Sequence, residues 1–104
     1  MQSLHWYNKT MVKVVITEHL QLRLKQREFP KWFPQHIHKN SKRQFYDTIE
    51  KSTIAIMELE YIGKIRNIMI AYVTEDKSDK IKTIHPIKEK EIKSRIKNKR
   101  WIKK

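Results

Sequence analysis

The stretch Ile68-Met69-Ile70-Ala71-Tyr72-Val73 decides the fold, because every one of its side chains is hydrophobic. A strand that is apolar on both of its faces is typical of a central strand that helices cover on one side. We therefore predict that the run from Ile65 to Thr74 is a central strand and forms the core of the domain.

Two strand-like runs precede this stretch and a third follows it. We predict strands at Gln44 to Ile49, Thr53 to Tyr61 and Ile81 to His85, where β-branched and aromatic residues are frequent and polar breaks separate the runs. Gly63 marks one of the turns, and Pro86 ends the last strand. The close spacing of the four runs predicts an antiparallel meander.

The N-terminal part predicts one short strand and two short helices. Met11 to Ile16 alternates as a strand does. The leucines in residues 20–24 fit a strand or a helix, but Thr17 as N-cap and the helix-forming residues after it favour a helix. A second short helix is expected to begin at Pro30 or Pro34.

The C-terminal part carries most of the charge. Residues 77–104 hold twelve Lys or Arg and three Asp or Glu, a net +9 of the total +13. After Pro86 a narrow stripe of isoleucines, Ile87, Ile92 and Ile96, predicts a helix whose remaining surface is basic. We expect one domain over residues 1–104, with an N-terminal extension at 1–10 and a basic helix and tail at 88–104. Cations packed so densely repel one another unless a polyanion neutralises them.

Composition excludes several classes of protein. There is no cysteine, which excludes disulfides, thiolate zinc sites and a cysteine nucleophile. With 38% hydrophobic residues the chain should fold, but 104 residues are too few to enclose a deep cofactor cavity, so we expect no cofactor. His36 and His38 lack an acidic neighbour, so no metal site is expected. Without a signal sequence or a long apolar run, we expect a cytoplasmic protein with no membrane role.

The predicted order of a strand, two short helices, four antiparallel strands and a basic helix resembles the RelE/ParE toxin superfamily. Short motifs are similar to those of an uncharacterised prokaryotic branch near the BrnT-type toxins, and the resemblance covers about residues 12–102. These motifs are Thr17-Glu18-His19 with Arg23 and Arg27, Tyr46-Asp47, Gly63-Lys64 with Arg66, Tyr72, Thr83-Ile84-His85-Pro86-Ile87, Arg95-Ile96 and Arg100-Trp101. The resemblance implies an α+β fold with an antiparallel sheet of about four to five strands, two short N-terminal helices and a basic C-terminal helix.

Members of this superfamily with known activity are mostly metal-independent endoribonucleases that often act on messenger RNA in the ribosome, whereas ParE-like relatives poison gyrase. The tail of this sequence, Trp101-Ile102-Lys103-Lys104, lacks the C-terminal tyrosine of the RelE pattern, and Lys99 stands where relatives tend to have glycine. The resemblance therefore implies a fold more directly than a reaction.

Metal-independent cleavage of RNA needs a base near the 2′-hydroxyl, a cation at the phosphate and an acid for the leaving oxygen. The residues that supply these groups are His19, Arg66, His85 and Arg95, our catalytic candidates, with Arg100 beside them. His19 also fits a packed residue at a helix start, and His85 fits a plain strand end equally well. Arg66 fits an ion pair with Asp47 or Glu60 equally well.

RNA is the expected polyanion, either ribosomal or messenger RNA. The candidate RNA-binding residues are Arg23, Arg27, Lys42, Arg43, Lys88, Lys93, Arg95, Lys97, Lys99, Arg100, Trp101, Lys103 and Lys104. Trp101 either stacks on a base or pins the last helix to the sheet, and the second role is favoured. DNA is less expected because no recognition helix is evident. A toxin would have a small acidic antitoxin as partner, and the alternative is a non-catalytic ribosomal or ribosome-associated protein.

Overall fold

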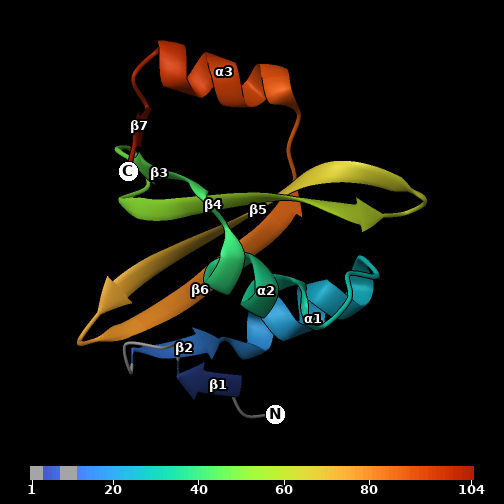
Figure 1. Ribbon diagram of the computed structural model, residues 1–104. Helices are drawn as coiled ribbons and strands as arrows, with labels where there is room; N and C mark the ends of the chain where they lie inside the picture. Colours follow the sequence, from blue (N-terminus) through green and yellow to red (C-terminus); the bar gives the residue numbers. More distant parts are fainter. Residues whose placement is uncertain (1–3, 8–11) are drawn as a thin grey trace.

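The predicted central strand is β5 (Lys64–Glu75), the middle strand of a seven-stranded sheet with the order β1-β2-β6-β5-β4-β3-β7. The structure is a computed structural model that describes residues 4–7 and 12–104 (Figure 1). The other strands are β1 (Leu4–Tyr7), β2 (Lys13–Ile16), β3 (Arg43–Asp47), β4 (Ser52–Tyr61), β6 (Ser78–Pro86) and β7 (Trp101–Lys103). The helices are α1 (Glu18–Gln26), α2 (Phe33–Asn40) and α3 (Glu89–Lys97).

Helices cover both faces of the sheet, which explains why β5 is apolar throughout. Ile68 and Ile70 pack with α1 and α2 in one buried cluster, whereas Met69 and Ala71 pack in a second cluster beneath α3. Figure 1 shows α1 and α2 on one side of the sheet and α3 on the other. The prediction of a central, helix-covered strand is confirmed, with α3 covering the face that was not assigned a cover.

The antiparallel meander from β3 to β6 is also confirmed. Each of these strands pairs antiparallel with the next, and the strand ends differ from the predicted ones by at most three residues. A tight charged turn joins β5 to β6, because only Asp76 and Lys77 separate the two strands. Both residues have positive φ, 49° and 60°, which a two-residue hairpin turn of type I′ requires.

The sheet is larger than expected and is mixed. β1 lies in the predicted N-terminal extension and pairs with β2, and β7 lies in the predicted tail and pairs with β3. β2 runs parallel to β6, so the sheet is not purely antiparallel. The structure therefore shows an α+β fold, with seven strands where about four to five were expected. The rest of the extension, residues 1–3 and 8–10, lies outside the described residues, as does Met11.

The two N-terminal helices begin where the sequence predicts. Thr17 caps α1 by accepting a hydrogen bond from the backbone N–H of Leu20 at 3.2 Å. Leu20 and Leu24 are buried whereas Leu22 is 50% exposed, which is helical rather than strand spacing. Pro34 lies in the first turn of α2, where its missing N–H costs no hydrogen bond.

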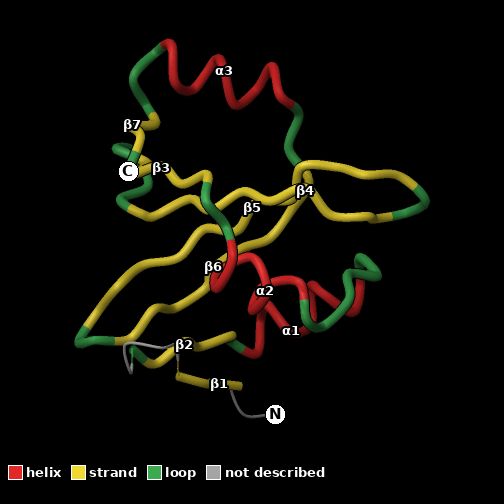
Figure 2. The backbone as a smooth tube through the Cα atoms, viewed as in Figure 1, coloured by secondary structure: helices red, strands yellow, loops and turns green. Residues whose placement is uncertain are grey.

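The third helix, α3, is connected to the sheet at both of its ends, through β6 before it and β7 after it. Figure 2 shows α3 joined to β6 and β7 by short loops. Ile87, just before α3, and Ile92, on α3, are buried in the cluster with Met69 and Ala71, but Ile96 is exposed, so the apolar stripe is shorter than predicted. Within the described part of the chain no helix is long and apolar enough to cross a membrane.

The central strand should dominate the stability of the domain. Ile70 is 0% exposed, so Ile70→Ala is expected to lower the free energy of unfolding by about 3 kcal/mol through lost burial and a residual cavity. Ile65 lies on the same strand and is 66% exposed, so Ile65→Ala should change the stability by less than about 0.5 kcal/mol. Urea unfolding of both variants measures the difference, and equal losses would contradict the assigned position of β5.

Candidate functional site

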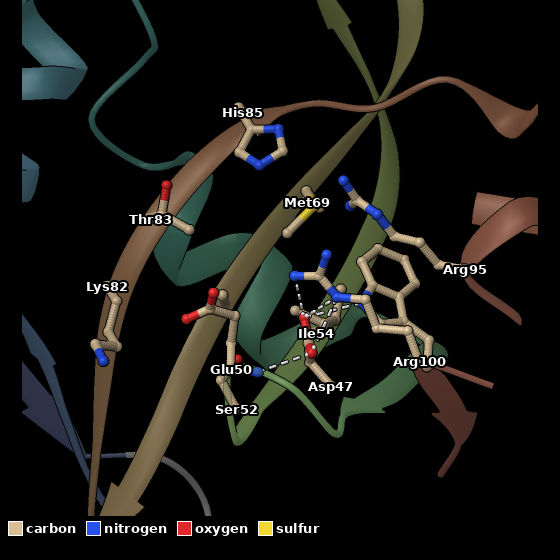
Figure 3. Close-up of a pocket in the computed structure, with 12 residues that line it drawn as sticks. Asp47, Glu50, Ser52, Ile54, Met69, Lys82, Thr83, His85, Arg95 and Arg100 are labelled. Carbon is tan, nitrogen blue, oxygen red and sulfur yellow. Dashed lines mark hydrogen bonds and ion pairs between the residues drawn. The ribbon is translucent and has the colours of Figure 1, made fainter. Parts of the chain in front are cut away.

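A cleft of about 240 Å³ lies between the sheet and the C-terminal segment that begins with α3 (Figure 3). Side chains from the β3–β4 turn, from β6 and from α3 and the loop after it meet around it. The polar residues that line it are Asp47, Glu50, Ser52, Lys82, Thr83, His85, Arg95 and Arg100. We call this hollow the α3 cleft.

A β-bulge places additional polar groups in the α3 cleft. Ala71 pairs with Thr83 and the next residue, Tyr72, pairs with Ile81, so Lys82 is an extra residue in β6. A bulge interrupts the alternation of side chains, and Lys82 and Thr83 therefore both line the cleft although they are neighbours. The sequence alternation alone predicted neither Lys82 nor Glu50 as a site residue.

His85 lies at the end of β6, opposite Met69, and lines the same cleft. Its Nδ1 lies 2.9 Å from the carbonyl oxygen of Pro86. A carbonyl can only accept, so Nδ1 carries the hydrogen and the neutral ring keeps its lone pair on Nε2. The half-buried imidazole is thus oriented as a proton acceptor at the edge of the cleft.

Arg95 reaches the cleft from α3. Its guanidinium carbon lies 5.0 Å from the centre of the Trp101 ring, a cation–π distance. The ring itself stacks on Phe45 at 5.5 Å, which ties the tail to the sheet. Arg95 is half-buried and is not bound to a carboxylate by any ion pair within residues 4–7 and 12–104, so its charge stays available to an anion in the cleft.

Asp47 fixes the position of Arg100. Arg100 donates through Nε and Nη2 to the two carboxylate oxygens at 3.1 to 3.3 Å, and Trp101 Nε1 donates to Oδ2 at 3.1 Å. The backbone N–H groups of Ile49 and Glu50 donate to Oδ1 at 3.0 Å. We call this group the Asp47 latch.

The latch is ionised at neutral pH. Burial by itself raises the pKa of Asp47, which is 2% exposed, but the donors from Arg100, from the turn and from Trp101 outweigh burial and lower this pKa from 3.8 to about 2. The hydrogen bond to Asp47 raises the pKa of Arg100 in turn. Arg100 therefore presents a permanent positive charge at a fixed place in the α3 cleft.

The structure brings two of the four catalytic candidates together. His85 and Arg95 both line the α3 cleft, together with Arg100. Side chains alternate along a strand, so Arg66 lies with Ile68 on the face of β5 opposite the cleft. Its Nε donates a hydrogen bond to the carbonyl oxygen of Tyr61 at 2.8 Å. It pairs with neither of the predicted carboxylates, and Asp47 is bound by Arg100 instead.

His19 lies away from the cleft. It is exposed in the first turn of α1, and α1 packs on the face of the sheet opposite α3. The structure therefore does not bring His19 and Arg66 together with His85 and Arg95 in one site. His19 does lie at a helix start, but it is exposed and not packed.

Six of the thirteen predicted RNA-binding residues form an exposed basic surface on and around α3. Its members are Lys88, Lys93, Lys97, Lys99, Lys103 and Lys104, all exposed. Arg43 contacts Glu89 of α3 at 2.7 Å, and Lys42 precedes it. Arg23 on α1 and Arg27 just after it are exposed on the other face of the sheet, so one nucleic-acid strand in the cleft does not reach them directly.

Trp101 pins the tail and does not stack on a base. Its side chain is 1% exposed, lies against Phe45 and donates to Asp47. Stacking on a base needs an open ring face, so that alternative is wrong for this conformation. The helix and tail predicted at 88–104 are in fact a helix that ends at Lys97 and a strand at Trp101–Lys103.

No protein-family model, curated protein or solved structure matches this chain. The resemblance to RelE/ParE toxins stays a prediction from motifs, and the function must be argued from the α3 cleft. Among the described residues no three His, Asp or Glu side chains gather as metal ligands do. His38 is buried and binds Asp79 at 2.8 Å.

Proposed function

We propose that this protein binds RNA and cleaves it in the α3 cleft by a mechanism that its own side chains supply, on a RelE/ParE-like fold. The observation that carries the proposal is the meeting of His85, Lys82, Arg95 and Arg100 in one hollow, because these groups supply a base, an acid and two fixed cations. The net charge of +13 adds a general attraction for phosphates.

In the proposed reaction His85 Nε2 takes the proton of a ribose 2′-hydroxyl, and the oxygen attacks the adjacent phosphorus. The bond from phosphorus to the 5′ oxygen breaks, leaving a 2′,3′-cyclic phosphate, and the ammonium of Lys82 gives a proton to the leaving oxygen. Arg95 and Arg100 stabilise the charge that builds on the phosphate oxygens. Exchange with water returns both side chains to their starting protonation states.

A second candidate is a non-catalytic protein that sits on ribosomal RNA. The exposed lysines on and after α3 favour it, because a surface this basic suits a protein embedded among phosphates. The nuclease would act on messenger RNA or the ribosome, and the structural protein would bind ribosomal RNA, so both candidates would place the protein in the cytoplasm. Only the toxin requires a small acidic antitoxin that covers this basic surface.

The two candidates separate in one experiment. Purified protein is incubated with ribosomes and end-labelled messenger RNA in excess chelator, the ribosomes are sedimented and the RNA ends are mapped. Discrete new ends support the nuclease, and one copy per ribosome with intact RNA supports the structural protein. A wholly free protein with intact RNA would contradict both.

Salt dependence locates the RNA-binding surface. Lys93 and Lys97 are exposed on α3, so the double variant Lys93→Gln/Lys97→Gln should lose two phosphate contacts and lower the slope of log K against log salt by about 1.4. Lys64→Gln/Lys77→Gln removes the same charge at the two hairpin ends of β5. This control should keep the parental slope, and equal slopes for both double variants would show that the surface lies elsewhere.

A further inference from the structure

The outer side of α2 carries an aromatic and polar stripe that the α3 cleft does not use. Trp32, His36 and Asn40 follow one another at intervals of four residues, so they share one side of the helix. Asn40 Nδ2 donates to the carbonyl oxygen of His36 at 3.0 Å and also contacts His36 Nδ1 at 3.2 Å. The stripe spans about 12 Å along the helix.

Trp32 is held in place and still exposed. Its ring makes perpendicular contacts with Phe33 at 4.7 Å and with His36 at 5.3 Å between centroids. About half of the side chain, 52%, remains open to solvent, whereas Trp101 is buried and Trp6 is half-buried. A single exposed tryptophan is common on protein surfaces and does not by itself indicate a binding site.

Basic residues continue the stripe. Asn40 also lines a shallow hollow of about 500 Å³ at the junction of α2 and β3, together with Lys42, Arg43 and Asn67. Glu58 is the acidic residue in its lining. Lys42 is exposed and forms no ion pair within the described ranges, so its charge is free for a ligand.

The ion pair of Arg43 does not prevent such a role. Arg43 Nη1 lies 2.7 Å from Glu89, but both side chains are more than 40% exposed. An exposed pair of this kind contributes little stability and is screened by salt, so a phosphate can displace the carboxylate. The pair also places the end of the stripe next to the start of α3, because Glu89 is the first residue of that helix.

We propose that this strip, from Trp32 through Asn40 to Lys42 and Arg43, is a second binding site for single-stranded RNA. Trp32 stacks on a base, and the two cations contact phosphates further along the same strand. An exposed aromatic ring beside a basic track is the combination that binds single strands without reading sequence. The site rests on the proposed RNA binding but is independent of cleavage in the α3 cleft.

Intrinsic fluorescence tests the stacking directly. The probe is oligoadenylate of about eight nucleotides with 2′-O-methyl groups, which blocks the 2′-hydroxyl and so prevents cleavage. The full-length protein should lose tryptophan fluorescence on titration, because Trp32 is the most exposed of the described tryptophans. Trp32→Phe should abolish the quenching, and persistent quenching in this variant would overturn the proposal.

Affinity is measured by the anisotropy of a labelled probe. Trp32→Ala should weaken binding about tenfold, and Trp32→Phe should recover part of the loss because a phenyl ring also stacks. Leu22→Ala removes another half-exposed apolar side chain, on α1, and should leave the affinity unchanged. An unchanged affinity in Trp32→Ala would overturn the site.

Inorganic polyphosphate separates stacking from charge. It has no bases, so Trp32→Ala should bind it as the parent does, whereas Lys42→Gln/Arg43→Gln should bind both polyanions less tightly. If Trp32→Ala lost polyphosphate as well, the stacking role would be wrong. The cleavage proposal is tested separately from this site. Quenching without any RNA cleavage would reject the nuclease and support this site. Cleavage without quenching would support the nuclease and reject this site.

Discussion

Replacing Asp47 with Asn is expected to lower the free energy of unfolding by about 3 kcal/mol. The carboxylate is buried and accepts hydrogen bonds from Arg100, Trp101 and two backbone N–H groups. An amide offers one acceptor oxygen instead of two and adds two donors for which the Asp47 latch has no acceptor. Because β7 is held to β3 at this point, its release should accompany the loss.

The pH dependence of the same variant gives a second signature. Asp47 has a lowered pKa in the folded protein, about 2 against 3.8, so its contribution is fully present above pH 4 and is lost as pH falls towards 2. The shift corresponds to about 2 kcal/mol. The parent should therefore lose this stability between about pH 4 and pH 2, and Asp47→Asn should not.

Asp76→Asn is the matched control. Asp76 is exposed in the β5–β6 turn with positive φ, which asparagine tolerates, so its stability should stay within about 0.5 kcal/mol of the parent. Urea unfolding at pH 7 and at pH 3 measures all three proteins. Equal stability of Asp47→Asn and the parent at pH 7 would show that the latch contributes nothing.

The fold was largely predictable because its central elements are local patterns. The apolar run in β5, the turn at Gly63 and the cap at Thr17 each act within a few residues, and all three lie as predicted. The two edge strands were missed because three or four residues carry too little periodicity. β7 depends on Asp47, which lies 54 residues before Trp101 and which spacing cannot connect to it.

The site was only half predictable, and the reason is the geometry of the sheet. His85 and Arg95 could be predicted as site residues from their residue types and sequence positions. The face on which a strand residue lies, however, follows from the register of the strands. Register places Arg66 on the α1 and α2 face, and the bulge leaves Lys82 beside Thr83 in the lining of the cleft. Neither a bulge nor the pairing of distant strands can be recognised from the pattern of a single sequence.

The Asp47 latch connects stability to the site. Arg100 is held by Asp47, and Trp101 packs under Arg95, so one buried carboxylate orders two of the cations around the α3 cleft. A displaced tail would move both arginines together. We therefore expect stability and RNA affinity to fall together in Asp47→Asn, whereas variants of His85 should separate chemistry from binding.

Replacing His85 with Ala is expected to lower the rate of RNA cleavage by about a hundred- to ten-thousandfold, with RNA affinity nearly unchanged. The imidazole is the proposed base and lies at the edge of the cleft, and removing it leaves the phosphate contacts in place. Arg95→Gln should cost about a hundredfold or more, because a neutral amide no longer stabilises charge in the transition state. Single-turnover cleavage of labelled RNA in chelator measures both rates.

His19→Ala and Arg66→Gln are the matched controls, because each removes the same chemical group from the opposite side of the sheet. His19 is exposed on α1, and Arg66 donates to a backbone carbonyl, so both variants should cleave within about threefold of the parent. Added imidazole should restore part of the rate to His85→Ala and none to Arg95→Gln, since it replaces a base and not a cation. Loss of cleavage in His19→Ala, with His85→Ala fully active, would place the chemistry on the other face and reject the α3 cleft as the active site.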